Sequence, residues 1–407
     1  MKNKFLENFF SLTLLRVLTL IVPLITFPYL IKTLGSENYG LVMWAWSIIN
    51  FFILFINFGF NLSITKHISI HRENKEKISE IVSTTLFAKF ILFLFSLIIF
   101  ILILMTIPKI NLYQDLFIYT FMFTFAETMM PIWYFQGIEK MKYTAIITSF
   151  IKIFFTVMVF LVIQKEDDYL KVPLLYTLSS AISTIFAYYI IFGKNKVILQ
   201  RPKISEAYLY IKNSTALFLS NSVSVIKESL SIIIIEQYIG LSAVAFYDIA
   251  QKFVNILITP FHIVATVLYP HLAKTKDFKI LKRTMLYTGL ISILLYCVTV
   301  FFNSQIVIFL YGQNNTEIIS LLNILAISII FANLASLLGT NGLVVVGENK
   351  KLLWSSLFGA VSFLGILFIL TSVNIISLGW IATGVVFGLI VEMASRAYFM
   401  KAFLWKK

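Results

Sequence analysis

The sequence has little charge for its length. Only 13% of its 407 residues are Asp, Glu, Lys or Arg, whereas soluble globular domains carry about 25%. Hydrophobic residues make up 59% of the chain. Apolar runs of about 20 residues recur from one end to the other, and the polar stretches between them are too short to fold as separate domains. The composition therefore excludes a soluble globular protein and indicates a membrane protein.

Cysteine and histidine are also scarce. The one cysteine, Cys297, lies inside an apolar run, which excludes a disulfide framework and a Cys-x-x-Cys metal or redox motif. The four histidines, His67, His71, His262 and His271, do not have the spacing of metal ligands. We therefore expect no metal site and no cofactor.

The apolar segments lack the alternation of apolar and polar residues that marks a transmembrane β-barrel, so the sequence predicts an all-α integral membrane protein. An apolar first segment follows Lys2 and Lys4 and continues to Leu34 without a small-residue cleavage site, which predicts a retained helix and not a signal peptide. Twelve helices are expected near residues 12–34, 40–61, 82–107, 116–136, 144–163, 172–192, 215–239, 243–269, 284–303, 317–339, 352–372 and 377–399.

The twelve helices divide into two sets of six. The expected organisation is an N-terminal lobe at 1–193, a basic cytoplasmic linker at 194–214 and a C-terminal lobe at 215–407. Gly35 and Asn50 precede Gly240 and Asn255 by 205 residues, which fits a repeat of one six-helix unit. Chance similarity between apolar sequences is the alternative explanation.

Lys and Arg are distributed unevenly over the loops. With the N-terminus inside, the cytoplasmic segments carry 23 of them and the outer loops carry four. Because the cytoplasmic side retains basic residues, this count predicts that both termini are cytoplasmic. The net charge of +14 is spread over the loops of one face, so it indicates contact with anionic membrane lipids and no nucleic-acid partner.

Eleven ionisable residues fall within the expected helices, where each charge is costly in lipid. Asp248 with Lys252, and Glu392 with Arg396, are four residues apart, a spacing that predicts an ion pair on one helix face. Glu236 lies near a helix end and can reach the interface.

The other six ionisable residues are candidates for a functional site. Arg16, Lys89 and Lys152 lie about 6 to 12 Å from the expected cytoplasmic helix ends, so they either extend to the lipid interface or face a cavity. Glu127, Lys227 and Glu228 lie about 16 to 20 Å from the helix ends. For these three we expect a hydrated central cavity, and a buried structural ion pair is the alternative.

Three segments resemble a known family. They are residues 23–40 (PLITFPYLIKTLGSENYG), 57–69 (NFGFNLSITKHIS) and 131–143 (PIWYFQGIEKMKY). They are similar to the Wzx family of O-antigen and related polysaccharide repeat-unit flippases. That family belongs to a superfamily that also contains multidrug extruders and the lipid II flippase. The motifs cover about the first 145 residues, and helix number agrees over the whole chain.

The resemblance implies a two-lobed transporter of the bacterial inner membrane. Its substrate would be an undecaprenyl-diphosphate-linked oligosaccharide, and its other partners a proton or sodium ion and polysaccharide-assembly proteins. The cationic lumen of the family would correspond to Arg16, Lys89, Lys152 and Lys227, placed by helix position and not by a motif. Glu127 and Glu228 are the candidates for ion coupling.

Two other functions are compatible with a chain of many transmembrane helices. An ion-coupled exporter of drugs or small solutes has the same fold, but organic cations favour carboxylates, and the helices hold six basic against five acidic residues. A membrane enzyme usually needs a large extramembrane loop for its catalytic groups, and the outer loops here are short. We therefore expect a flippase and not an enzyme.

Overall fold

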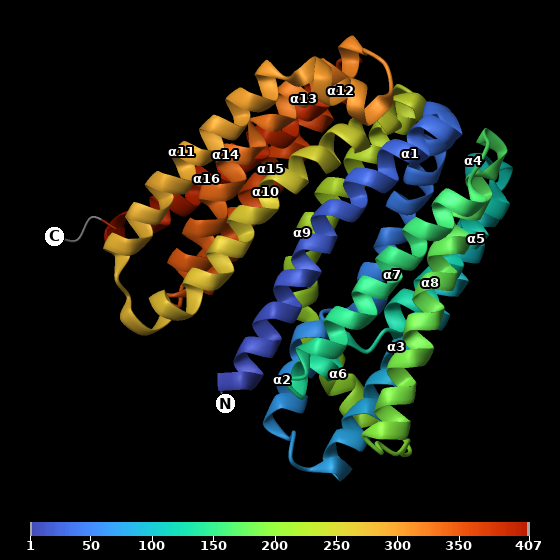
Figure 1. Ribbon diagram of the computed structural model, residues 1–407, viewed down its shortest axis with the longest axis vertical. Helices are drawn as coiled ribbons and strands as arrows, with labels where there is room; N and C mark the ends of the chain where they lie inside the picture. Colours follow the sequence, from blue (N-terminus) through green and yellow to red (C-terminus); the bar gives the residue numbers. More distant parts are fainter. Residues whose placement is uncertain (1, 405–407) are drawn as a thin grey trace. The chain divides into compact units, whose positions relative to one another are not determined.

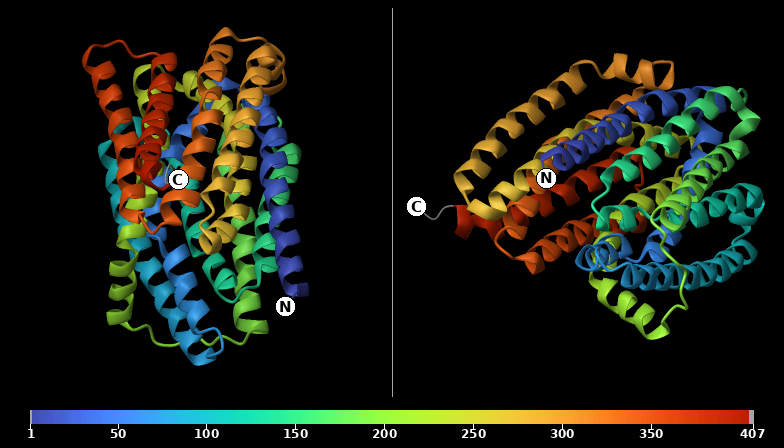
Figure 2. Two further views of the ribbon diagram at one scale, coloured as in Figure 1. Left: turned by 90° about the vertical axis from the view of Figure 1, so that its left-hand side faces the viewer. Right: turned by 60° about the horizontal axis from the view of Figure 1, so that its bottom comes forward.

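A computed structural model describes the backbone of residues 2–404 and the side chains of residues 22–403, apart from positions 216, 220, 224 and 270. All regular secondary structure in these residues is helical, so the all-α prediction is confirmed. The chain divides into two compact units, Met1–Ser229 and Leu230–Lys407. Within each unit the long helices run roughly parallel or antiparallel to their neighbours (Figures 1 and 2).

Eleven helical stretches of the described chain are long and apolar enough to cross a membrane. The first, Val22–Ile70, has 49 residues, about 74 Å of helix, which is more than twice the roughly 30 Å hydrocarbon core. Gly35 interrupts this stretch with a φ of 75°, which glycine adopts without a steric penalty. Val22–Ile70 therefore supplies two passes, and the fold has about twelve transmembrane helices, as predicted.

The N-terminal unit is built from the first helices of the chain. They are α1 (Lys2–Asn57), α2 (Phe60–Ile70), α3 (Lys75–Thr106), α4 (Pro108–Leu112), α5 (Gln114–Met129), α6 (Ile132–Gly137), α7 (Met141–Val162), η1 (Glu166–Leu170), α8 (Lys171–Tyr188), η2 (Tyr189–Lys194) and α9 (Ile204–Tyr238). Helix α1 packs on α7, and α8 packs on both α5 and α7. Helix α9 continues across the boundary between the units.

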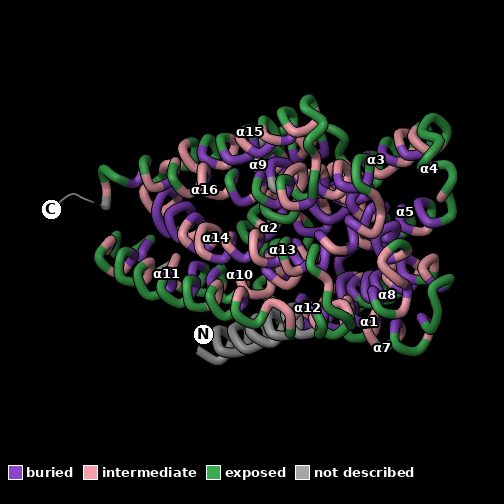
Figure 3. Tube along the Cα trace, turned by 90° about the horizontal axis from the view of Figure 1, so that it is seen from above, coloured by how far each residue is buried: buried purple, intermediate pink, exposed green. Residues whose placement is uncertain are grey.

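Between residues 83 and 96, helix α3 has its polar side chains on the buried face. Ser83, Lys89 and Ser96 are all buried. Its large exposed residues are Phe90, Ile91, Leu94, Phe95, Ile98, Ile101, Leu102 and Met105. A helix on the surface of a soluble protein has the opposite arrangement. Exposed residues also follow one edge of α11 (Phe278–Phe301) along its length (Figure 3). The described helices thus present an apolar surface suited to lipid.

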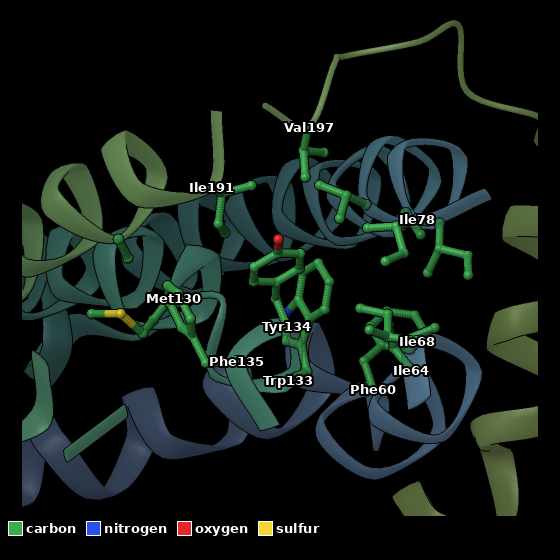
Figure 4. Packing of buried hydrophobic residues seen from close by; sticks show 14 of the residues in the cluster. Phe60, Ile64, Ile68, Ile78, Met130, Trp133, Tyr134, Phe135, Ile191 and Val197 are labelled. Carbon is green, nitrogen blue, oxygen red and sulfur yellow. The ribbon is translucent and has the colours of Figure 1, made fainter. Parts of the chain in front are cut away.

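The predicted fourth helix is interrupted, so α5 ends at Met129 and the short α6 begins at Ile132. Trp133 and Tyr134 of α6 are buried in an apolar cluster with Ile64 and Ile68 of α2 (Figure 4). Gly137 allows this contact, because a Cβ atom there would lie 2.6 Å from the Ile68 side chain. Helices α2 and α6 therefore pack closely at this end of the unit.

The non-helical segment 195–203 lies along α3. The amide of Gln200 donates to Ser83 Oγ at 2.9 Å, and the Lys203 ammonium forms an ion pair with Glu80 at 3.1 Å. Tyr210, nearly two turns into α9, is buried nearby, and burial together with the charges of Glu206 and Glu80 raises its pKa to about 12. These contacts hold segment 195–203 against α3 within the N-terminal unit.

The C-terminal unit contains α10 (Leu241–Thr275), α11, α12 (Asn303–Tyr311), α13 (Thr316–Ala326), α14 (Ser328–Ser336), η3 (Leu337–Val344), α15 (Asn349–Ser372) and α16 (Leu378–Leu404). The predicted tenth helix is irregular: it comprises α13, α14 and the π-helical η3. Gly359 of α15 and Gly388 of α16 lie in contact, because a Cβ atom on either would be 2.7 to 2.8 Å from the carbonyl oxygen of the other.

Candidate functional site

The break between α5 and α6 frees backbone carbonyl groups inside the N-terminal unit. Pro131 has no amide hydrogen, and the amide of Ile132 donates to the carbonyl of Met130 at 3.1 Å. In a continuous helix that amide would donate to the carbonyl of Thr128. The amide of Met130 likewise donates to Glu127 and not to Ala126. These carbonyls need other donors, because unpaired buried carbonyls are costly.

Side chains from two other helices supply those donors. The hydroxyl of Thr184 on α8 donates to the carbonyl of Ala126 at 3.0 Å, and the hydroxyl of Tyr188 donates to that of Met129 at 2.5 Å. The ammonium of Lys89 on α3 donates to the carbonyl of Thr128 at 2.6 Å. The break is therefore stabilised by two neutral donors and one charged donor.

Lys89 is one of the largest fully buried side chains, with a relative exposure of 1%. Its ammonium also donates to Oδ1 of Asn57 at the end of α1, at 3.0 Å. Glu127 interacts with it electrostatically, although the two side chains form no ion pair within 4.0 Å. The predicted residues Lys89 and Glu127 are thus brought together, and Lys89 reaches neither an interface nor an open surface in this conformation.

Glu127 is half-buried beside an aromatic group. It interacts electrostatically with Tyr176 of α8, whose ring packs edge-on against Trp46 at 4.7 Å. Phe123, one turn before Glu127, contacts both rings. The carboxyl group therefore lies near both Lys89 on α3 and Tyr176 on α8.

Lys152 of α7 is half-buried near α1. One turn further along α7, the hydroxyl of Thr156 lies 2.9 Å from that of Thr26, so the helices are in polar contact there. Among the described side chains Lys152 forms no ion pair. Arg16 is another of the four basic candidates, and its side chain lies outside the described residues.

Lys227 and Glu228 lie near the middle of the membrane-spanning part of α9, Leu217–Tyr238. Lys227 is half-buried, and Glu228 is exposed. A charged group at this depth is expected to face water or an ionic partner, because exposure to lipid would cost several kcal/mol. The pair therefore remains a candidate for a hydrated cavity.

The C-terminal unit has its own buried ionic group. Arg396 of α16 contacts Glu392 directly, so the ion pair predicted from their spacing is confirmed. The Arg396 guanidinium also donates to Oγ of Ser355 at 3.1 Å, to Oγ of Ser356 at 3.0 Å and to the carbonyl of Ala335 at 2.7 Å. It therefore joins α14, α15 and α16.

The second predicted pair is also present. Lys252 lies 2.7 Å from Asp248 on α10. No group of three or more His, Cys, Asp or Glu side chains in the described chain is arranged to hold a metal ion. The candidate site is thus a set of fixed charges inside helical units, with Lys89 and Arg396 as the most fully bonded cations.

Several of these hydrogen-bond partners could not be predicted from the sequence. Asn57, Ser355 and Ser356 are ordinary residues in apolar helices, and nothing local marks them as ligands of a charge. Pro131, five residues before the end of the predicted fourth helix, is the sequence signal that could have indicated freed carbonyl groups nearby.

The chain is similar to proteins of known families. A family model described as "Polysaccharide biosynthesis protein" matches residues 5–276. A relative from Escherichia coli (strain K12), named "Putative O-antigen transporter", is 25% identical over 260 residues, 63% of this chain. The matched part spans 61% of that relative, less than two thirds of its length.

Solved structures share the fold. The lipid II flippase MurJ in an inward closed conformation is 16% identical, with a TM-score of 0.74 over 98% of this chain and 88% of that one. An inward-facing multidrug resistance MATE family transporter of the MOP superfamily is also 16% identical, with a TM-score of 0.71 over 94% of this chain and 98% of that one. At this identity the likeness shows the fold.

Proposed function

Because the chain belongs to the polysaccharide biosynthesis protein family, we propose that it is a flippase for undecaprenyl-diphosphate-linked oligosaccharide repeat units. It would move them from the cytoplasmic to the outer leaflet of the bacterial inner membrane by ion-coupled alternating access. Both termini would be cytoplasmic, and polysaccharide-assembly proteins would receive the product. The proposal also holds that the protein carries out transport and no catalysis.

The observation that carries this proposal is the presence of fixed charges within apolar helices, in a chain of this family. Lys89 is buried inside the N-terminal unit, and Glu228 is exposed in the middle of a membrane-spanning helix. Such charges are costly in lipid and mark transport pathways by default. A chain that only anchored other proteins would have no need of them.

The substrate requires this kind of interior. Its diphosphate is charged, and each buried sugar hydroxyl left without a partner costs roughly 2 to 7 kcal/mol. The head group is therefore confined to one leaflet unless a hydrated path with fixed cations lowers the barrier. The polyprenyl tail can remain in lipid throughout.

The proposed roles follow the positions of the charges. Arg16, Lys152 and Lys227 would contact the diphosphate. Lys89 could contact the diphosphate only by breaking its hydrogen bonds to Asn57 and Thr128. We therefore assign it primarily a structural role inside the N-terminal unit. Glu127 and Glu228 would exchange a proton or bind sodium during the cycle.

An ion-coupled exporter of drugs or small solutes is the second candidate, since the MATE transporter has the same fold. A fold hosts many functions, so the choice depends on the substrate tested. Uptake of an organic cation would favour the exporter, and movement of a lipid-linked sugar would favour the flippase.

The test is translocation in proteoliposomes. Purified protein is reconstituted with a lipid-diphosphate oligosaccharide in one leaflet, and its arrival in the other is followed, normalised to folded protein. Arg16→Gln, Lys152→Gln and Lys227→Gln should each weaken substrate affinity about 10-fold to 150-fold, through loss of a charge-assisted hydrogen bond. Lys350→Gln, at an exposed position in the first turn of α15, is the matched control.

The same assay tests ion coupling. With an imposed proton or sodium gradient, Glu127→Gln and Glu228→Gln should lose the acceleration that the gradient gives wild type. Wild-type rates in all three basic variants would reject the cationic path, and equal acceleration in both acidic variants would reject their coupling role. No translocation by folded wild-type protein would reject the flippase itself.

A further inference from the structure

The three carbonyls at the end of α5 are bonded in different ways. Those of Ala126 and Met129 accept from neutral hydroxyls, but that of Thr128 accepts from the ammonium of Lys89. A neutral donor satisfies a carbonyl, so the need for a hydrogen bond does not by itself explain a buried charge. The position of the amine requires a further reason.

The surroundings of the amine favour a positive charge. The last carbonyls of a helix carry a partial negative charge, because the peptide dipoles of the helix add along its axis. Oδ1 of Asn57 adds a second oxygen at 3.0 Å, and Glu127 lies on the last turn of α5. In transporters with interrupted helices, such carbonyl ends coordinate monovalent cations. Lys89 therefore places its ammonium where oxygen ligands would hold a cation.

We propose that Lys89 is a built-in cation that fills a monovalent-cation site at the carboxyl end of α5. The break between α5 and α6 would then keep its conformation without binding an exchangeable ion from solution. Removal of the amine would leave oxygen ligands from Asn57 and Thr128 that can bind sodium, potassium or a small alkylammonium ion. Lys89 is a positioning residue in this view, and the inference does not depend on which substrate the protein carries.

The C-terminal unit supports the proposal with an independent example. The guanidinium of Arg396 donates to the carbonyl of Ala335, at the point where α14 gives way to the π-helical η3. Glu392 lies beside Arg396, as Glu127 lies near Lys89. Gly339 permits the approach, since a Cβ atom there would lie 2.9 Å from the guanidinium. Each unit thus binds a buried basic side chain to a carbonyl where a helix is irregular.

The experiment measures the melting temperature of purified full-length protein in nanodiscs. Lithium, sodium, potassium, choline and methylammonium chlorides are compared at equal ionic strength. Each variant is compared with wild type in the same salt, so that any cation bound elsewhere in the protein cancels. Lys89→Ala should melt lower in choline, by on the order of 5 °C or more. Sodium, potassium or methylammonium should restore much of that loss in a saturable way.

Three matched variants separate loss of the positive charge from loss of a hydrogen bond or of side-chain volume. Lys89→Met fills the space of the side chain without a charge, so it should be destabilised and not restored by any cation. Thr184→Val and Tyr188→Phe remove the neutral donors to the adjacent carbonyls, so they should be destabilised equally in all five salts. These two variants control for loss of a hydrogen bond at the same break.

Two outcomes would overturn the proposal. One is a Lys89→Ala protein whose loss of melting temperature relative to wild type is the same in all five salts. The other is a Lys89→Met protein as stable as wild type. If Lys89→Ala does not fold, Asn57→Asp decides, because a carboxylate 3.0 Å from a charged amine should raise the melting temperature. In that case a lower melting temperature for Asn57→Asp would overturn the proposal, because it would mean that the amine carries no charge.

Discussion

At the scale of single residues, the buried charges are tolerated because each is surrounded by matching groups. Arg396 has donors directed to Glu392, to two serine hydroxyls and to a backbone carbonyl. Such a buried ionic group stabilises the protein little more than apolar residues of the same size would. Removal of one partner, however, leaves the other charge buried and uncompensated. The cost of a substitution therefore depends on whether its partner is also removed.

This reasoning predicts a non-additive result for Arg396 and Glu392. Arg396→Met alone should destabilise the protein by about 3 to 5 kcal/mol, because it leaves the buried Glu392 carboxylate without its cation. The double variant Arg396→Met/Glu392→Leu should recover much of that loss. Thermal unfolding of all three proteins in the same detergent measures the difference. A double variant less stable than Arg396→Met would show that the carboxylate has a separate stabilising role.

At the scale of helices, glycine sets how closely α15 and α16 approach. Gly359 and Gly388 place backbone against backbone, with no room for a side chain between them. In lipid, where helices gain little from leaving one apolar medium for another, close packing of small residues drives their association. The contact between α15 and α16 should therefore be sensitive to a single added methyl group.

We expect Gly359→Ala to destabilise the protein by about 1 to 3 kcal/mol, because its Cβ atom would lie 2.7 Å from the carbonyl oxygen of Gly388. Gly365→Ala, two turns along the same helix, is the matched control. Its Cβ atom would meet nothing within 4 Å, so that variant should be neutral or slightly more stable. Equal melting temperatures for the two variants would contradict the packing argument.

At the scale of the whole molecule, the sequence was most informative where interactions are local. Helix number follows from runs of apolar residues, and the pairs Asp248–Lys252 and Glu392–Arg396 follow from their spacing of one helical turn. The partners of Lys89 could not be predicted, because Asn57 and Thr128 lie 32 and 39 residues away in sequence. Their proximity depends on how three helices pack, which apolar composition does not encode.

The distribution of basic residues predicts one property of the whole chain, its orientation. The segments expected in the cytoplasm carry 23 Lys and Arg residues and the outer loops carry four, so both termini should be cytoplasmic. Cys297 is the one cysteine in the sequence and is exposed, so Cys297→Ser gives a background for labelling single introduced cysteines.

In that background, cysteines at Lys196 and Lys276 should react with a membrane-impermeant maleimide only after the membrane is opened. Cysteines at Lys109 and Lys165 should react in intact spheroplasts. The physical reason is that moving a cluster of basic residues outward opposes both the membrane potential and the attraction of anionic lipids on the cytoplasmic face. Labelling of the position-196 cysteine in intact spheroplasts would show the opposite orientation. The proposed transport path would then start in the outer leaflet.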